Sequence, residues 1–254
     1  MILKWIFDRV MALVGLVALC WIYPIVAILI KIKMPGGPVF FVQKRVGKDG
    51  RLFNCHKFRT MRNPTPALPE GEGDSPIPDV PSPTRSLSLE GKGSKGWSTV
   101  SVAGDARITP FGAKLRHWKI DELPELWDVL IGNMSFVGPR PDVPGYADKL
   151  VGDDRVILKL RPGITGPATL KYRLEDEMIA NKIREIENGE LIIENLPEGL
   201  AKQELAVWYN DNVIYPDKVR LNKYYYEHYS FWKDIQMIVC TVLGKQMAYA
   251  GEVI

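Results

Sequence analysis

The chain has 254 residues, of which 46% are hydrophobic and 25% are charged. This balance excludes wholesale disorder, which requires low hydrophobicity together with a high net charge. Charge is distributed unevenly, because residues 1–62 carry 11 Lys and Arg against 2 Asp and Glu, whereas the other residues carry 22 against 28. A basic segment that also holds the longest apolar run favours an acidic membrane surface over nucleic acid as the partner.

The cysteines and histidines exclude two further classes of protein. Cys20, Cys55 and Cys240 are odd in number and far apart, which argues against a disulfide scaffold and against a zinc ribbon. The three histidines are equally scattered and form no HExxH pair. The chain is therefore expected to be attached to a membrane in a reducing compartment, without a metal site made of Cys and His.

A hydrophobic helix is the first predicted element. Residues 10–30 are 21 consecutive uncharged, mostly apolar residues, and a straight helix of that length reaches roughly 30 Å, enough to cross a bilayer core. The run is too long for a signal peptide, and no small-residue cleavage site follows it. Pro24 predicts a break near Tyr23 and Pro24, and basic residues on both flanks favour the cytoplasmic side for both ends. A single span and a helix that re-enters and returns to the same face both remain open.

A β-hairpin is predicted next, from residues 39–42 through a turn at residues 47–50 to residues 52–58, because an Asp-Gly pair separates two β-prone runs. It would place Lys57 and Arg59 on one face of the second strand. Residues 63–97 contain 7 Pro, 5 Gly and 5 Ser, which predicts a disordered insertion in a surface loop. The GxGxxG pattern at residues 91–96 is not a dinucleotide site, since no apolar strand precedes it.

Helices are predicted for most of the remaining chain. Thr109 and Pro110 open one helix as its N-cap and first residue, and a second begins near residues 121–124, with Pro124 in its first turn. Solvated helices are expected at residues 175–190 and 200–209. An apolar helix is expected at residues 235–243, and the aromatic residues before it fit either lipid headgroups or core packing.

Asp121 and Glu122 are the candidate catalytic pair, although acids at a helix start are often simple caps. Arg116 lies five residues before Asp121, and two Gly- and Pro-rich turns at residues 137–141 and 161–166 each carry an arginine. Such turns can direct backbone N–H groups and a guanidinium at an anion. With Lys57 and Arg59, these residues would form a diphosphate site.

A carboxylate is the available nucleophile, because the chain has no P-loop and no kinase catalytic loop. A carboxylate can form an acyl-phosphate intermediate. A divalent cation would screen the repulsion between this carboxylate and a diphosphate, and Mg²⁺ suits a site made of oxygen ligands.

Several short sequence segments, in the same order along the chain, resemble the bacterial sugar transferase family, the small monotopic phosphoglycosyl transferases that use polyprenyl phosphate. The segments, after the Pro-containing hydrophobic N-terminus, are residues 57–61 (Lys-Phe-Arg-Thr-Met), 104–109 (Gly-Asp-Ala-Arg-Ile-Thr), 121–126 (Asp-Glu-Leu-Pro-Glu-Leu), 133–141 (Asn-Met-Ser-Phe-Val-Gly-Pro-Arg-Pro), 161–166 (Arg-Pro-Gly-Ile-Thr-Gly) and 229–235 (Tyr-Ser-Phe-Trp-Lys-Asp-Ile). Residues 171–219 are longer than in the usual small member.

The resemblance implies an α+β fold: a mostly helical monotopic membrane protein with an N-terminal re-entrant, Pro-broken hydrophobic helix, a β-hairpin and interfacial amphipathic helices. Residues 1–37 would form the membrane-embedded helix. Residues 38–62 and 98–254 would form a catalytic domain on the cytoplasmic face of the bacterial inner membrane. Residues 63–97 would be a disordered insertion.

The resemblance also implies a two-step transfer. Asp121, paired with Glu122 and close to Mg²⁺, would attack the β-phosphate of a nucleotide-diphosphate sugar, usually a UDP-sugar, and polyprenyl (undecaprenyl) phosphate would then accept the sugar phosphate. The residues implied to bind phosphate or substrate are Lys57, Arg116, Arg140 and Arg161. The expected partners are these two substrates and membrane lipids, with no nucleic acid; a homodimer is retained as an option.

Two other functions remain as alternatives. In a single-span, membrane-tethered binding protein, Asp121 and Glu122 would only cap a helix and the arginines would grip anionic lipid. In a lipid-phosphate phosphatase, the same diphosphate site would release sugar phosphate or inorganic phosphate without a polyprenyl acceptor.

Overall fold

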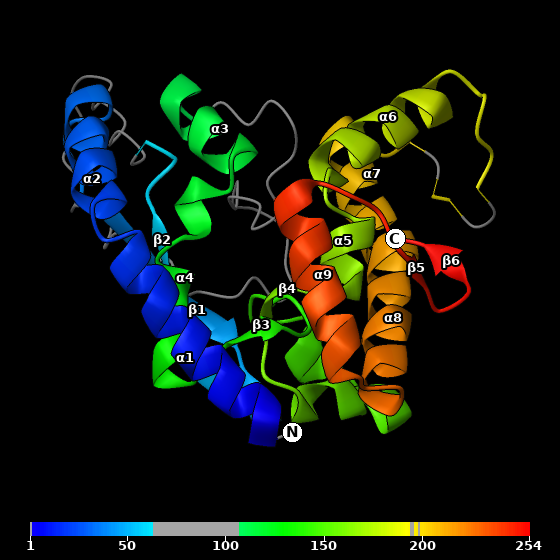
Figure 1. Ribbon diagram of the computed structural model, residues 1–254. Helices are drawn as coiled ribbons and strands as arrows, with labels where there is room; N and C mark the ends of the chain where they lie inside the picture. The colour runs from blue at the N-terminus through cyan, green and yellow to red at the C-terminus, as the bar shows by residue number, and fades with distance from the viewer. Residues whose placement is uncertain (1, 63–106, 194–195, 198) are drawn as a thin grey trace, which may run out of the picture.

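The protein is seen in a computed structural model, which describes residues 2–62, 107–193, 196–197 and 199–254 (Figure 1). The insertion predicted at residues 63–97, the glycine pattern within it and the start of the segment at residues 104–109 lie outside the described residues. The helices and strands are α1 (Ile2–Ala18), α2 (Ile22–Lys33), β1 (Phe40–Val46), β2 (Leu52–Phe58), α3 (Pro110–His117), α4 (Glu125–Ile131), β3 (Ser135–Val137), β4 (Gly163–Thr165), α5 (Pro167–Lys171), α6 (Glu175–Glu187), α7 (Lys202–Tyr209), α8 (Tyr215–Glu227), α9 (Phe231–Leu243), β5 (Ala248–Tyr249) and β6 (Glu252–Val253). The fold mixes helix and sheet, and helix predominates.

The N-terminal apolar run forms two helices with a sharp bend between them. Among the described residues no single helix is long and apolar enough to cross a membrane, whereas α1 and α2 together meet that criterion but are bent by 62°. The predicted break near Tyr23 and Pro24 is displaced: α1 ends at Ala18, and Pro24 lies in the first turn of α2. A proline disturbs the turn before it, because its ring meets the carbonyl group four residues earlier. The break therefore falls before the proline.

The predicted hairpin is confirmed as an antiparallel pair, in which Phe40 is opposite Phe58 and Val46 is opposite Leu52. Its turn is tight because Asp49 and Gly50 both adopt positive φ angles, of 58° and 75°. Asp and Gly tolerate this left-handed conformation better than most residues.

Two short parallel strands, β3 and β4, hold the two arginine-bearing turns together, with Ser135 opposite Gly163. Their backbones approach so closely that a Cβ atom on Gly138 would lie 2.3 Å from the carbonyl oxygen of Arg161. A Cβ atom on Gly166 would lie 2.3 Å from the carbonyl oxygen of Gly138. Glycine is therefore required at these contacts for steric reasons.

The C-terminal part of the chain supplies the larger cores. Helices α8 and α9 lie side by side (Figure 1) and bury Leu221, Tyr225 and Met237 with Val137 of β3. The helices predicted at residues 175–190 and 200–209 form as α6 and α7, and both bury apolar residues such as Ile183 and Leu205 in a core of their own. These two helices are therefore solvated on only part of their surface.

Helix α1 is joined to the rest of the protein by polar side chains as well as by apolar packing. Lys4 Nζ donates to Asp234 Oδ2 of α9 at 2.8 Å. Ser135 Oγ of β3 donates to Asp8 Oδ2 at 2.7 Å. Asp8 and Asp234 are both nearly fully buried, and an unpaired buried charge is costly. The position of α1 against β3 and α9 is therefore strongly specified.

Candidate active site

Asp121 and Glu122 lie in a one-turn 3₁₀ segment, Ile120–Glu122, between α3 and α4. The prediction that Thr109 caps α3 is confirmed, since its side chain accepts a hydrogen bond from the Gly112 amide. The prediction that both acids begin the next α-helix needs a correction, because α4 starts only at Glu125, after Pro124. Pro124 has no N–H to donate, so the turn that carries the acids and the helix after it are separate.

The turn that carries these acids follows a residue with an unusual backbone. Lys119 has a φ angle of 54°, in the left-handed region. This conformation costs a residue with a side chain of this size roughly 1 kcal/mol. The strained residue reverses the chain after α3 and buries Asp121 and Glu122, which are 7% and 8% exposed.

The buried Glu122 lies at the centre of a cluster of ion pairs whose cations are partly exposed. Lys57 Nζ of β2 is 2.9 Å from Glu122 Oε1 and 3.1 Å from Glu125 Oε1. Arg140 Nη2, from the turn after β3, is 2.7 Å from the same Glu122 oxygen. The hairpin, the acidic turn and the turn after β3 therefore meet at one point.

These contacts determine the charge of the cluster. Burial alone would raise the pKa of Glu122, but Arg140 and Lys57 together hold it well below its usual range. Burial would lower the pKa of Lys57, yet Glu122 and Glu125 outweigh that effect and raise it. The pKa of Arg140 is raised above its ordinary value, chiefly by Glu122. Glu122 is therefore ionised, and both cations keep their protons.

Asp121 has a different environment from its neighbour. Its Oδ1 atom is buried and has no hydrogen-bond partner among the described residues. Burial raises the pKa of Asp121 and Glu122 raises it further, while Lys57, Lys119 and Arg116 act in the opposite direction. An unpartnered carboxylate oxygen beside several cations is chemically available, either to attack an electrophile or to bind a cation.

Arg116 also lies close to the acids. Its Nε atom donates to Thr60 Oγ1 at 3.0 Å, directly after the hairpin. Helix α3 fits tightly against this segment, since a Cβ atom on Gly112 would lie 1.9 Å from the Thr60 carbonyl oxygen. Lys57, Arg116 and Arg140 are thus three predicted phosphate-binding residues that the fold brings to Asp121 and Glu122.

Arg161 points elsewhere. Its Nε atom donates to the Gly132 carbonyl oxygen at 3.0 Å, at the C-terminal end of α4, whereas Asp121 and Glu122 precede the N-terminal end. The structure therefore does not bring Arg161 to the carboxylates, and the binding role predicted for it stays a prediction.

Glu125 is a site residue that the sequence reasoning missed. It is 2% exposed and shares Lys57 with Glu122. Burial raises the pKa of Glu125, although Lys57 acts against that shift. Its spacing of three residues from Glu122 would have been a usable signal, because residues three apart share one face of a helical segment.

Mg²⁺ would have few protein ligands at this site. The described residues contain no group of three or more His, Cys, Asp or Glu side chains that could hold a metal ion. The unpartnered Asp121 Oδ1 nevertheless fits a Mg²⁺ ion, which commonly takes one or two carboxylates and completes its shell with substrate phosphates and water. Glu122 is already committed to Lys57 and Arg140.

A mixed helix-and-sheet fold, in which a buried aspartate with one unpartnered oxygen lies near several cations, is typical of proteins that bind anionic groups. The family model described as bacterial sugar transferase matches residues 1–193. The chain belongs to the bacterial sugar transferase family.

Three relatives illustrate the range of similar proteins. Exopolysaccharide production protein ExoY of Sinorhizobium fredii is 33% identical over 161 residues, which cover 63% of this chain and 65% of that protein. Undecaprenyl-phosphate galactose phosphotransferase of Salmonella typhimurium is 36% identical over 138 residues, which cover 54% and 26%. UDP-glucose:undecaprenyl-phosphate glucose-1-phosphate transferase of Xanthomonas campestris pv. campestris is 31% identical over 250 residues, which cover 95% and 39%. The matched region thus spans between about a quarter and two thirds of these relatives.

Proposed function

We propose that this protein transfers a sugar 1-phosphate from a nucleotide-diphosphate sugar, a UDP-sugar in the first instance, to a polyprenyl phosphate such as undecaprenyl phosphate. The observation that carries the proposal is the buried Asp121 oxygen without a partner, next to a glutamate held by Lys57 and Arg140. The names of two relatives, a galactose phosphotransferase and a glucose-1-phosphate transferase acting on undecaprenyl phosphate, support the substrate class. Such a reaction would begin glycan assembly on a lipid carrier.

In the first step, an Asp121 carboxylate oxygen attacks the β-phosphorus of the nucleotide sugar. The bond between this phosphorus and the bridging oxygen breaks, and the nucleoside monophosphate leaves with that oxygen. The sugar phosphate remains on Asp121 as a mixed anhydride. Lys57, Arg116 and Arg140 stabilise the phosphate oxygens as their charge redistributes.

In the second step, a phosphate oxygen of the polyprenyl phosphate attacks the same phosphorus. The bond to Asp121 breaks, the aspartate is regenerated, and the product is a polyprenyl diphosphate sugar. Glu122 keeps Lys57 and Arg140 in position throughout, because both cations contact the same Glu122 oxygen. When bound, Mg²⁺ would screen the repulsion between Asp121 and the diphosphate.

The proposal includes a membrane position for the N-terminal helices. The 62° bend between α1 and α2 supports a re-entrant arrangement, with both ends on the cytoplasmic face and residues 1–37 embedded in the membrane. Large apolar side chains are exposed along α1, such as Val10 and Val17, and along the amphipathic helix α9, such as Val242. Exposed apolar faces of this kind favour contact with lipid. Single cysteines at Ile2 and Lys33, in a cysteine-free background, should react with an impermeant reagent on the same membrane side.

The activity is tested with protein in nanodiscs, Mg²⁺, undecaprenyl phosphate and a panel of UDP-sugars. UMP release should require one particular sugar and should fall at least 1,000-fold in Asp121→Asn. The control is Asp153→Asn, a side chain that is 94% exposed, which should retain wild-type release. With a β-³²P-labelled sugar nucleotide and no lipid acceptor, the label should become attached to the wild-type protein and be released by hydroxylamine.

Each alternative predicts a different result. A tethered binding protein would release no UMP with any sugar and would place its two ends on opposite sides of the membrane. A phosphatase would release sugar phosphate or inorganic phosphate at the same rate without undecaprenyl phosphate. Unchanged UMP release in Asp121→Asn would overturn the role proposed for this residue.

A further inference from the structure

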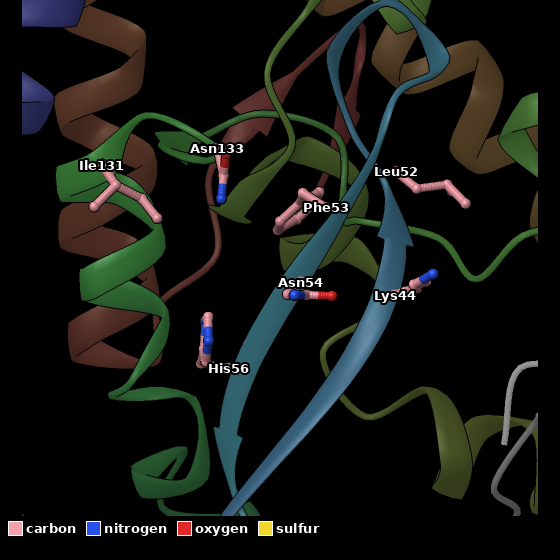
Figure 2. A pocket seen from close by; sticks show the side chains of 7 residues that line it. All are labelled: Lys44, Leu52, Phe53, Asn54, His56, Ile131 and Asn133. Atoms are coloured by element: carbon pink, nitrogen blue, oxygen red, sulfur yellow. The ribbon is translucent and has the colours of Figure 1, made fainter. Parts of the chain in front are cut away.

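A hollow with both polar and apolar lining lies beside the hairpin, outside the cluster of Asp121 and Glu122. It has a volume of about 510 Å³ and lies between the hairpin and the C-terminal end of α4. Its polar lining consists of Lys44, Asn54, His56 and Asn133. Figure 2 shows Asn54 on β2 between His56, on the side of α4, and Lys44, on the side of β1. The proposed transfer reaction uses none of these four side chains.

His56 is held in a fixed orientation by a buried acid. Its Nδ1 atom lies 2.8 Å from Asp128 Oδ1, and its backbone N–H donates to Asp128 Oδ2 at 2.9 Å. Asp128 is fully buried, whereas 31% of the His56 side chain is exposed. Because a carboxylate can only accept, Nδ1 carries a hydrogen. Nε2, which has no partner among the described residues, is the ring atom left for a ligand.

The other polar side chains are arranged around this imidazole. Lys44 and Asn54 are cross-strand partners in the hairpin, so their side chains lie on one face of it. Asn133 approaches from the end of α4. Ammonium and amide groups donate hydrogen bonds, and no acidic side chain lines this hollow in the part of the chain that the structure describes. The lining is therefore suited to an anion.

The end of α4 beside the hollow carries additional positive charge. Arg9 Nη1 donates to the Val129 carbonyl oxygen at 3.0 Å, and Arg161 Nε donates to the Gly132 carbonyl oxygen at 3.0 Å. A helix C-terminus carries roughly half a negative charge, which two guanidinium groups exceed. Asp8, adjacent to Arg9 in the sequence, is hydrogen-bonded to Ser135 instead. Arg161, which does not reach the carboxylate cluster, thus lies next to Asn133.

From this arrangement we infer that the hollow is a second binding site, for a phosphate monoester group. Lys44 supplies the charge, Asn54 and Asn133 donate hydrogen bonds, and His56 Nε2 accepts one from the hydroxyl group of a singly protonated phosphate. Leu52 and Ile131, both about half exposed, line the same hollow. This lining would recognise the phosphate group both in a free phosphate and in a phosphate that carries an apolar chain.

NMR of the histidine rings tests the inference on the full chain in nanodiscs, with inorganic phosphate as the first probe. The chain has three histidines, so His117 and His228 serve as internal references. The His56 ring resonances should shift and saturate, while the other two should not respond. Lys44→Glu should weaken binding at least tenfold. Lys48→Glu, the same charge change at an exposed lysine of the same hairpin that does not line the hollow, should alter it less than twofold.

Two further comparisons identify the source of the phosphate and separate this site from the proposed active site. If nanodiscs that contain phosphatidic acid shift His56 and those with phosphatidylglycerol do not, while inorganic phosphate has no effect, the ligand is a lipid headgroup. The His56 response should persist in Arg140→Ala, which impairs the carboxylate cluster. Equal shifts of all three histidines, no shift with either probe, equal effects of Lys44→Glu and Lys48→Glu, or loss of the response in Arg140→Ala would each overturn the inference.

Discussion

At the scale of single residues, one lysine holds two buried carboxylates at the centre of the site. Lys57 Nζ contacts both Glu122 and Glu125 within 3.1 Å, and Arg140 is the other cation on Glu122. An isolated buried carboxylate is costly, because the charge loses water without gaining a partner. The stability of this region and the position of Glu122 therefore depend on the same lysine.

Replacement of Lys57 by Met should destabilise the protein by about 3 kcal/mol, because it removes the ion pair that the buried Glu125 makes with Lys57. It should also lower UMP release at least 100-fold, since Glu122 and the phosphate oxygens lose a contact. Thermal unfolding in nanodiscs measures the first effect and the release assay measures the second. Lys44→Met, at an exposed residue of the same hairpin, is the control for stability; an equal loss in both variants would refute the argument.

The Asp142 carboxyl group should make the stability of the folded protein depend on pH. Burial raises its pKa to about 6, from an ordinary value of 3.8, and Tyr215 donates a hydrogen bond to it. The folded state therefore binds this proton more tightly than the unfolded state does. The stabilising contribution is complete below the unfolded pKa and is lost as the pH rises to about 6.

Asp142→Asn should remove this dependence, because an amide keeps the hydrogen bond from Tyr215 without a charge. Between pH 4 and pH 7, the wild type should lose about 2–3 kcal/mol of unfolding free energy relative to the variant. Denaturant unfolding of both proteins at several pH values gives this difference. Parallel curves for the two proteins would mean that Asp142 is ionised at the same pH in the folded and unfolded states.

At the scale of elements, the structure follows the sequence wherever a local signal is strong. The cap at Thr109 and the hairpin turn at Asp49 and Gly50 could be predicted, because both rest on interactions between neighbouring residues. Helix α8 was not predicted. Its Tyr224–Tyr226 run is consistent with lipid headgroups or with a core, and only the fold places Tyr225 beside Asp234 with a hydrogen bond of 2.7 Å. Long-range contacts of this kind leave no local pattern.

The candidate site, too, could be predicted from the sequence only in part. The sequence predicted that Lys57, Arg59, Arg116, Arg140 and the acidic pair form one site. The structure places Lys57, Arg116 and Arg140 close to the acids, whereas the Arg59 guanidinium donates to the Met34 carbonyl oxygen. The sequence could not predict where the Arg161 guanidinium points, because that depends on the packing of β4 against the end of α4. Nor could it locate the turn that precedes α4, which depends on the left-handed backbone of Lys119.

Because β3 and β4 approach each other so closely, a change in the backbone at Gly138 should affect the candidate site. Gly138→Ala places a Cβ atom against the Arg161 carbonyl oxygen, so the two strands must separate. We expect a loss of about 2 kcal/mol or more in stability, since neither backbone can yield easily, and reduced UMP release because Arg140 lies two residues further on. Gly189→Asn is the control: it has no atom within 4 Å, and Asn tolerates its φ of 75°. Wild-type stability of Gly138→Ala would show that this contact is loose.

At the scale of the whole molecule, α1 connects the N-terminus to distant parts of the chain. Lys4 binds Asp234 across 230 residues of sequence, and Asp8 accepts from Ser135 across 127 residues. Figure 1 shows α1 passing along α4 and β3 toward the base of α9. The helix that supplies much of the exposed apolar surface is therefore also fixed to the domain that carries the site.

Lys4→Met should loosen this attachment. Within the part of the chain that the structure describes, the Asp234 carboxylate would then keep only the Tyr225 hydroxyl group as a partner, which should cost about 2–3 kcal/mol. Hydrogen–deuterium exchange should rise across α1 and β3 but not in α6 and α7, which form a separate core. Lys4→Arg, which retains the charge, should restore most of the protection; exchange that rises equally in α6 would argue for global destabilisation instead.

The same two contacts have a consequence for biosynthesis. A ribosome adds roughly 5–20 residues per second, so the 230 residues between Lys4 and Asp234 correspond to roughly 10–50 s of translation. During that interval α1 has been made but Lys4 lacks its final partner, and Asp8 gains Ser135 only after a further 127 residues. Lys4 therefore remains hydrated for the longer of the two intervals, and Asp8 for the shorter one. The contact between Lys4 and Asp234 forms only after α9 has been synthesised.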